Sequence, residues 1–116
     1  MHAVSSGSLG EVTSQLAQGA DINASDDEGL TALHFAAIEQ NPEIIDALIS
    51  HGADVNVVDK YGNTPLARAV FYYRGSTDVI PLLLNAGSDP EKQNLHGVSP
   101  KSLAHDIANY DVKKFF

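Results

Sequence analysis

The tripeptide GAD at residues 19–21 and 52–54, with its variant GSD at residues 87–89, reveals how this chain is organised. The copies begin 33 and 35 residues apart, and a polar run after each copy ends in a second glycine at the same spacing (Gly29, Gly62 and Gly97). A repeat of this length indicates a stack of similar units, each burying its apolar face against the next. Such stacks present a surface and do not enclose a pocket, so the spacing favours binding over catalysis.

Each unit carries the signals of two short helices. Thr31 can cap a first helix, because its hydroxyl can accept a free main-chain N–H. Asn41 and Pro42 can start a second helix, whose apolar residues recur at helical spacing (Ile44, Ile45, Leu48 and Ile49). Gly52 can end it, where a left-handed backbone is needed. The following unit repeats the pattern. Thr64 can cap its first helix, Ser76 or Thr77 can cap its second helix, and Gly87 can end that helix.

The opening of each unit resembles the ankyrin repeat. Residues 29–37 (GLTALHFAA) are similar to the family's G-x-T-P-L-H-x-A-A signature with alanine in place of proline, and residues 52–56 match its G-A-D-V-N step. The resemblance implies a mainly α fold, a solenoid of about three to four helix-turn-helix units with short β-hairpin fingers. Within a single domain of residues 1–116, it implies a truncated first unit (1–25), units at 26–58 and 59–93, and a partial capping unit (94–116), whose Phe115 and Phe116 are expected to plug the stack.

The charge balance constrains the partner. The 116 residues include 15 carboxylates against 7 Lys and Arg, a net charge of −8 at pH 7. This charge repels nucleic-acid phosphates and anionic membranes, and it steers a basic protein toward the chain; the simpler alternative is that it keeps the protein soluble. There is no cysteine, so disulfides and thiolate metal sites are excluded, and no signal-like or membrane-length apolar run is present. We expect a cytoplasmic protein that is monomeric in isolation.

One unit departs from the pattern. Unit 59–93 carries two more residues between its helices than unit 26–58, next to the aromatic run FYYR at residues 71–74. Tyrosine and arginine dominate interface hot spots, because they bury much area for little lost entropy. We therefore predict partner anchors here and at Tyr61. The alternative is that Phe71 packs into the stack and Tyr73 only shields the insertion.

In ankyrin proteins the fingertips and the exposed sides of the first helices form a concave face that holds the partner. Carried over to matching positions of this chain, the resemblance predicts partner-binding residues in both full units and in the last one. Asp26, Asp27 and Glu28, with Glu39, are expected to form an acidic patch, although a solvated turn is the simpler alternative. The complete predicted set is Asp27, Glu28, Leu30, Ile38, Glu39, Lys60, Tyr61, Asn63, Phe71, Tyr72, Tyr73, Arg74, Leu95, His96 and Asp106.

Nothing in the sequence predicts catalysis. The family's T-P-L-H histidine braces neighbouring loops, and His34 takes that place here. His51 falls at a helix end that favours a cation. His96 and His105 lack metal-ligand spacing, and no nucleophile elbow, phosphate loop or dinucleotide fingerprint is present. We predict no catalytic residue, no cofactor and no metal, and therefore no enzyme.

The specific role has three candidates. The chain resembles small stand-alone bacterial ankyrin proteins, some of which are immunity proteins that silence a cognate toxin. Small size, acidic charge and the lack of an export signal suit an inhibitor of a basic toxin, and this role is the first prediction. They suit equally an adaptor or an ankyrin fragment of a larger scaffold. An enzyme with no recognisable motif is the remote third candidate.

Overall fold

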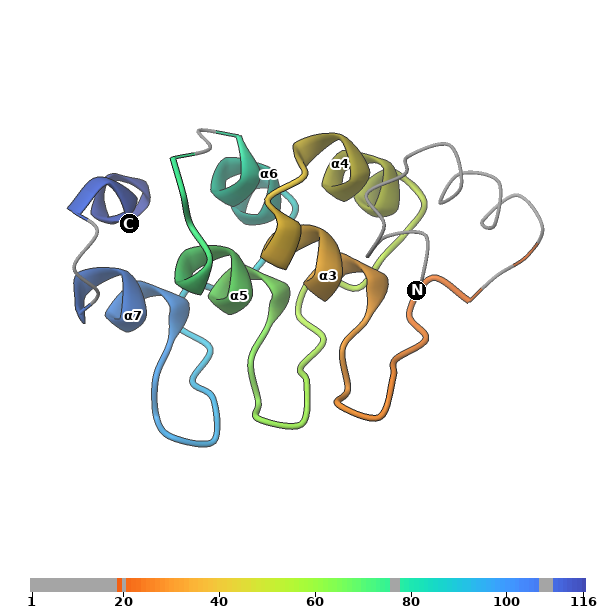
Figure 1. Cartoon of the computed structure of the whole chain (residues 1–116), viewed down its shortest axis with the longest axis horizontal. Helices are drawn as coiled ribbons and strands as arrows, with labels where there is room; N and C mark the ends of the chain where they lie inside the picture. The colour runs from red at the N-terminus through yellow and green to blue at the C-terminus, as the bar shows by residue number, and fades with distance from the viewer. Residues whose placement is uncertain (1–18, 20, 76–77, 107–109) are drawn as a thin grey trace.

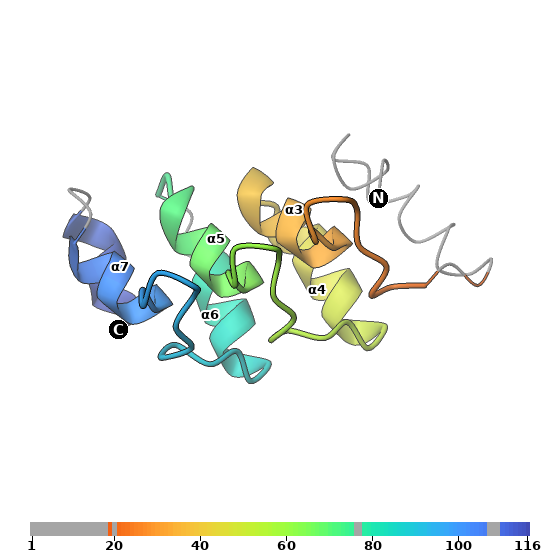
Figure 2. The ribbon, with the colours of Figure 1, turned by 90° about the horizontal axis from the view of Figure 1, so that it is seen from below.

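A computed structural model describes residues 19, 21–75, 78–106 and 110–116, so most of the predicted unit 1–25 lies outside the described residues. The helices are α3 (Ala32–Glu39), α4 (Pro42–Ser50), α5 (Pro65–Phe71), α6 (Val79–Asn85), α7 (Pro100–Asp106) and a 3₁₀ helix, η1 (Tyr110–Phe115). Helices α3, α5 and α7 lie side by side in one layer, and α4 and α6 form a second layer behind them (Figures 1 and 2). This is the predicted mainly α solenoid.

The helices start where their side chains can satisfy free main-chain donors. The side chains of Thr31, Asn41 and Thr64 accept hydrogen bonds from main-chain N–H groups three residues on, which confirms all three predicted caps. Proline follows two of these caps directly, at a position where no donor is needed. The N-cap of α6 is Asp78, while the predicted caps Ser76 and Thr77 lie outside the described residues.

Both second helices end in the same motif. After α4, the N–H of Gly52 donates to the oxygen of Ile49 at 3.0 Å and the N–H of Ala53 donates to that of Leu48 at 3.0 Å. Gly87 and Ser88 repeat these bonds after α6. The two glycines have φ of 90° and 101°, a left-handed conformation that carries little strain only without a Cβ. The predicted stops are confirmed.

The core runs between the two layers. It is built from the predicted apolar stripes of α4 and α6 and from small residues of α3 and α5, where alanines let neighbouring helices approach closely. Val112 and Ala104 extend it into the last unit, and Phe115 and Phe116 pack against it half-buried, as expected of a plug. Each unit is therefore stabilised mainly by contact with its neighbours.

The projecting loops are hairpin turns without regular strands. We call them finger 1 (residues 23–29), finger 2 (56–62) and finger 3 (90–97); they hang from one side of the helical layers (Figure 1). Within the described residues the only β-pairing is an isolated antiparallel bridge between Ser25 and Thr31. Each finger is closed by a main-chain bond across its turn: Asp26 to Leu30, Asp59 to Asn63 and Asn94 to Val98.

Candidate functional site

A carboxylate or amide side chain closes each finger. Asp26, Asp59 and Asn94 occupy equivalent positions, and the Oδ1 atom of each accepts two main-chain N–H bonds, from the residues two and four positions on, at 2.8–3.0 Å. Such side-chain acceptors replace the main-chain partners that a strand would supply. The fingers are therefore fixed loops that can present side chains in a defined direction.

Main-chain bonds also join neighbouring fingers. The N–H of Lys60 donates to the oxygen of Glu28, and the N–H of Leu95 donates to the oxygen of Tyr61, both at 3.0 Å. Glycine is needed at this approach: a Cβ on Gly62 would lie 2.9 Å from the nitrogen of Leu95. The three fingers consequently form one continuous surface.

His34 braces this surface from below, as predicted. Its side chain is fully buried, and Nδ1 accepts the main-chain N–H of Thr31 at 3.2 Å. The opposite ring nitrogen, Nε2, therefore carries the proton and donates to the oxygen of Asn63 at 2.8 Å. Burial lowers the pKa of His34, although the bond to Asn63 opposes this shift. The ring is neutral and fully hydrogen-bonded, which suits a structural part.

The fingers together with the exposed sides of α3, α5 and α7 form the surface that we call the inner face, which corresponds to the predicted concave face. The exposed large apolar side chains of the described residues lie on fingers 2 and 3 and at the end of α5. Tyr61 is 43% exposed, Phe71 62% and Leu95 74%. Val58 and Tyr72 are also exposed. The Phe71 and Tyr72 rings meet edge to face, with centroids 5.1 Å apart. Clustered exposed apolar side chains mark interaction surfaces.

A cavity of about 260 Å³ opens in the same face. It lies between α5 and α7 beneath fingers 2 and 3, and its apolar wall consists of Ala67, Phe71, Val98 and Leu103. Its polar rim includes the predicted contact residues Asn63 and His96. Asn94 and the guanidinium of Arg68 complete this rim. Because pockets for small-molecule ligands usually measure about 300–1,000 Å³, this volume suits a single side chain better.

The predicted acidic residues lie at the other end of the inner face. Asp27 and Glu28 are exposed on finger 1, where the carboxylate of Glu28 pairs with the Lys60 ammonium at 2.9 Å. The same ammonium lies 5.2 Å from the centre of the Tyr61 ring. Glu39 ends α3 half-buried, and this burial raises the pKa of its carboxyl, against the opposing effect of the Arg74 guanidinium.

The insertion divides into a buried and an exposed half. Tyr73 is only 8% exposed and its ring packs edge to face on Phe115, with centroids 5.8 Å apart. It therefore has almost no surface to offer a partner, and the alternative of a shielding role fits its position. Arg74 is exposed, and its Nη2 donates to the main-chain oxygen of Glu39 at 2.6 Å, which ties the insertion to α3.

The remaining predicted contact residues are spread over the inner face. Leu30 and Ile38 are half-buried in unit 26–58. The amide oxygen of Asn63 accepts a bond from the Asn94 side chain at 2.9 Å. Asp106 is exposed at the last residue of α7 and does not line the cavity.

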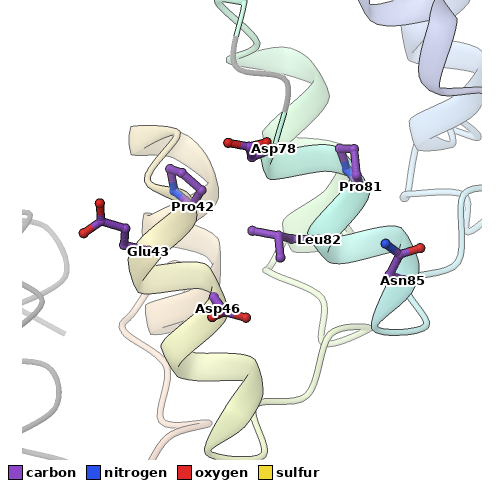
Figure 3. Close-up of a pocket in the computed structure, with 7 residues that line it drawn as sticks. All are labelled: Pro42, Glu43, Asp46, Asp78, Pro81, Leu82 and Asn85. Atoms are coloured by element: carbon purple, nitrogen blue, oxygen red, sulfur yellow. The ribbon is translucent and has the colours of Figure 1, made fainter.

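The structure also has a groove that the sequence did not predict. It lies on the outer face, between α4 and α6, and holds about 490 Å³. Figure 3 shows Asp46 on α4 and Leu82 on α6 directed into the space between the two helices. Its further lining residues are Pro42, Glu43, Asp78, Pro81 and Asn85. The groove forms only when outward-facing residues of two helices come together on stacking of the units, so no local sequence pattern predicts it.

Within the described part of the chain, no group of three or more histidine, aspartate and glutamate side chains is placed to hold a metal ion. No described helix has the length and apolar character needed to cross a membrane. His96 and His105 are exposed on different elements, finger 3 and α7.

Known proteins share this architecture. A family model described as ankyrin repeats (3 copies) matches residues 1–94. An intracellular phospholipase A2 of Caenorhabditis elegans is 35% identical over 81% of this chain, and the match covers 9% of that protein. A putative ankyrin repeat protein of fowlpox virus is 38% identical over 72% of the chain and 26% of its own length. An E3 ubiquitin-protein ligase of Arabidopsis thaliana is 36% identical over 80% of the chain and 6% of its own length.

The match therefore spans about a quarter or less of each of these relatives. These relatives are viral and eukaryotic proteins, and none of their names mentions bacterial toxin immunity. The matched model covers four fifths of the sequence, and the stacked helix pairs with linked fingers agree with it. The chain belongs to the ankyrin repeat family.

Proposed function

We propose that this chain is a non-catalytic module that holds a partner protein on its inner face. The observation that carries the proposal is the set of exposed large apolar side chains on fingers 2 and 3 and at the end of α5, one of which, Phe71, lines the cavity. Exposed aromatic side chains beside a pocket are the usual anchors of a protein interface, and the rigid fingers reduce the entropy lost on binding. Binding then acts by covering whatever surface of the partner lies beneath.

An adaptor or scaffold role is the specific function that we favour. The relatives described above are much longer proteins, among them a phospholipase and a ubiquitin ligase, in which the matched segment is a small part. A module of this kind can locate a larger protein or a complex on its target without doing chemistry itself.

A dedicated inhibitor of a basic toxin is the second candidate. The net charge of −8 and the exposed carboxylates of finger 1 support this role, because they attract a basic protein. The two roles differ in the number of partners: an inhibitor has one tight basic partner, and a scaffold segment has several or shares its partner with flanking domains.

The test is affinity capture from a lysate of the producing cell, followed by measured affinities. The bait proteins are the wild type, the inner-face double variant Tyr61→Ala/Tyr72→Ala, and the outer-face control Asp46→Ala/Asn85→Ala. Both inner-face residues are exposed, so the double variant should remain folded, as circular dichroism can verify. We expect the double variant to weaken the partner about 30-fold or more and the control to leave it unchanged.

The reverse pattern, in which the outer-face control loses the partner and the inner-face variant keeps it, would overturn the proposal. A single stoichiometric basic partner would favour the inhibitor role over the scaffold role.

A further inference from the structure

The cavity between α5 and α7 combines an apolar wall with a polar rim whose one charged group, the Arg68 guanidinium, is already paired. No carboxylate lines it, and the Arg68 guanidinium at its edge is already bonded to Asp59 at 2.6 and 2.9 Å. The amide oxygens of Asn63 and Asn94 are likewise used within the protein. The cavity is therefore suited to an apolar side chain and offers nothing to balance a buried charge.

A half-buried acidic group on the inner face belongs to the neighbouring unit. Glu39 and Tyr72 are equivalent positions at the ends of the adjacent helices α3 and α5. No ion pair to the Glu39 carboxylate is present among the described residues, since Arg74 bonds to its main-chain oxygen and not to its carboxylate. On finger 1, by contrast, the Glu28 carboxylate already has Lys60.

Partial burial makes Glu39 a favourable place for a cation. Its carboxylate is half-buried at the end of α3, and burial raises its pKa more than the nearby Arg74 guanidinium lowers it, so a cation brought by a partner would add stabilisation. The overall charge of −8 favours the approach of such a cation.

The spacing between the two features defines the partner segment. Packed helices lie about 8–10 Å apart, so Glu39 on α3 is on the order of 10–15 Å from a cavity between α5 and α7. An extended chain covers this distance in about three to five residues. One short segment lying across the three helices can therefore reach both.

We propose that the inner face binds one linear segment of its partner, which places a large apolar side chain in the α5–α7 cavity and a lysine or arginine on the Glu39 carboxylate. This inference rests on the proposed function and specifies the partner's chemistry. It excludes an acidic or phosphorylated segment at this end of the face, because such a segment would bring like charge to Glu39.

The test uses a phage-displayed library of random twelve-residue peptides, selected on the full chain. We expect selected peptides to share one large apolar residue and one basic residue, three to five positions apart. Phe71→Ala should weaken such a peptide tenfold or more, and Glu39→Gln about fivefold, measured by calorimetry. Leu82→Ala and Asp46→Asn on the outer face are the matched controls, and both should leave binding unchanged.

A charge exchange gives the sharpest result. A peptide with its basic residue replaced by glutamate should bind the wild type poorly and recover on Glu39→Lys, while the original peptide weakens on that variant. Thermal melts show whether each variant is folded, which is expected because Phe71 is 62% exposed.

Three outcomes overturn the inference. They are selected peptides without the apolar and basic pair, peptides that ignore Phe71→Ala and Glu39→Gln, and a library that yields no binder. If such peptides still respond to Tyr61→Ala/Tyr72→Ala, the inner face binds proteins but by other contacts, and the proposed function survives. If the captured natural partners also bind Tyr61→Ala/Tyr72→Ala as tightly as the wild type, both the inference and the proposed function fail.

Discussion

Units 26–58 and 59–93 build the same helix pair and the same finger, yet they brace the finger differently. In the first unit the buried neutral ring of His34 links Thr31 to Asn63, the residue that follows finger 2. In the second unit Ala67 takes the place of His34, and a buried carboxylate, Asp59, bonds to the guanidinium of Arg68. Finger 2 is therefore braced from both neighbouring units, by a neutral ring on one side and by an ion pair on the other.

The two units also differ at their exposed positions. Ile38 and Glu39 end the first helix of unit 26–58, whereas Phe71 and Tyr72 stand at the equivalent places in unit 59–93 and are followed by the insertion. Core positions repeat because every unit must pack on its neighbour, whereas inner-face positions do not have to pack in this way and are free to vary. The departures from the repeat are thus the place to look for function.

The largest expected effect distinguishes the equivalent aspartates of fingers 1 and 2. Asp59→Ala removes four hydrogen bonds and leaves a part-buried guanidinium unpaired, so we expect the free energy of unfolding to fall by about 3–5 kcal/mol. Asp26→Ala removes two exposed bonds in the equivalent finger, and we expect about 1 kcal/mol. Urea denaturation measures both; equal losses would show that the buried ion pair does not brace finger 2.

The next effect compares two glycines with similar positive φ. Gly62→Ala would place a methyl group 2.9 Å from the main chain of finger 3, whereas a Cβ on Gly97 meets nothing within 4 Å. We expect about 1 kcal/mol from left-handed strain in each variant, and about 2 kcal/mol more for Gly62→Ala as the bond between Tyr61 and Leu95 is broken. If the two variants lost the same stability, close finger stacking would not contribute.

The smallest effect is a pH dependence that belongs to unit 26–58 alone. The folded pKa of His34 is lowered from 6.5, so the unfolded chain takes up its proton first as the pH falls. The contribution of His34 is therefore intact above pH 6.5 and is lost as the pH falls from there toward the folded pKa. In His34→Gln the free energy of unfolding should change less steeply with pH below 6.5. An unchanged slope would contradict a buried neutral ring.

The sequence predicted what depends on local chemistry. The caps at Thr31, Asn41 and Thr64 and the stops at Gly52 and Gly87 each involve residues within a few positions of one another. The repeat spacing then placed the helices in order, because equivalent units must stack in the same way.

The sequence could not predict what depends on contacts between distant segments. Burial of Tyr73 requires Phe115, which is far along the chain. The bonds between neighbouring fingers, from Lys60 to Glu28 and from Leu95 to Tyr61, join residues more than 30 positions apart. The inner cavity and the outer groove arise only when side chains of different units come together. The predicted contact residues themselves remain predictions, with Tyr73 as the residue that the structure buries.

Hydrogen–deuterium exchange of the chain, free and bound to its captured partner, tests most directly whether the inner face is the binding surface. The account predicts that exchange slows in residues 59–74 and 94–98, while outer-face amides in residues 42–50 and 79–85 keep their rates. Slowed exchange confined to α4 and α6, with the fingers and the end of α5 unchanged, would contradict it and would move the site to the outer groove.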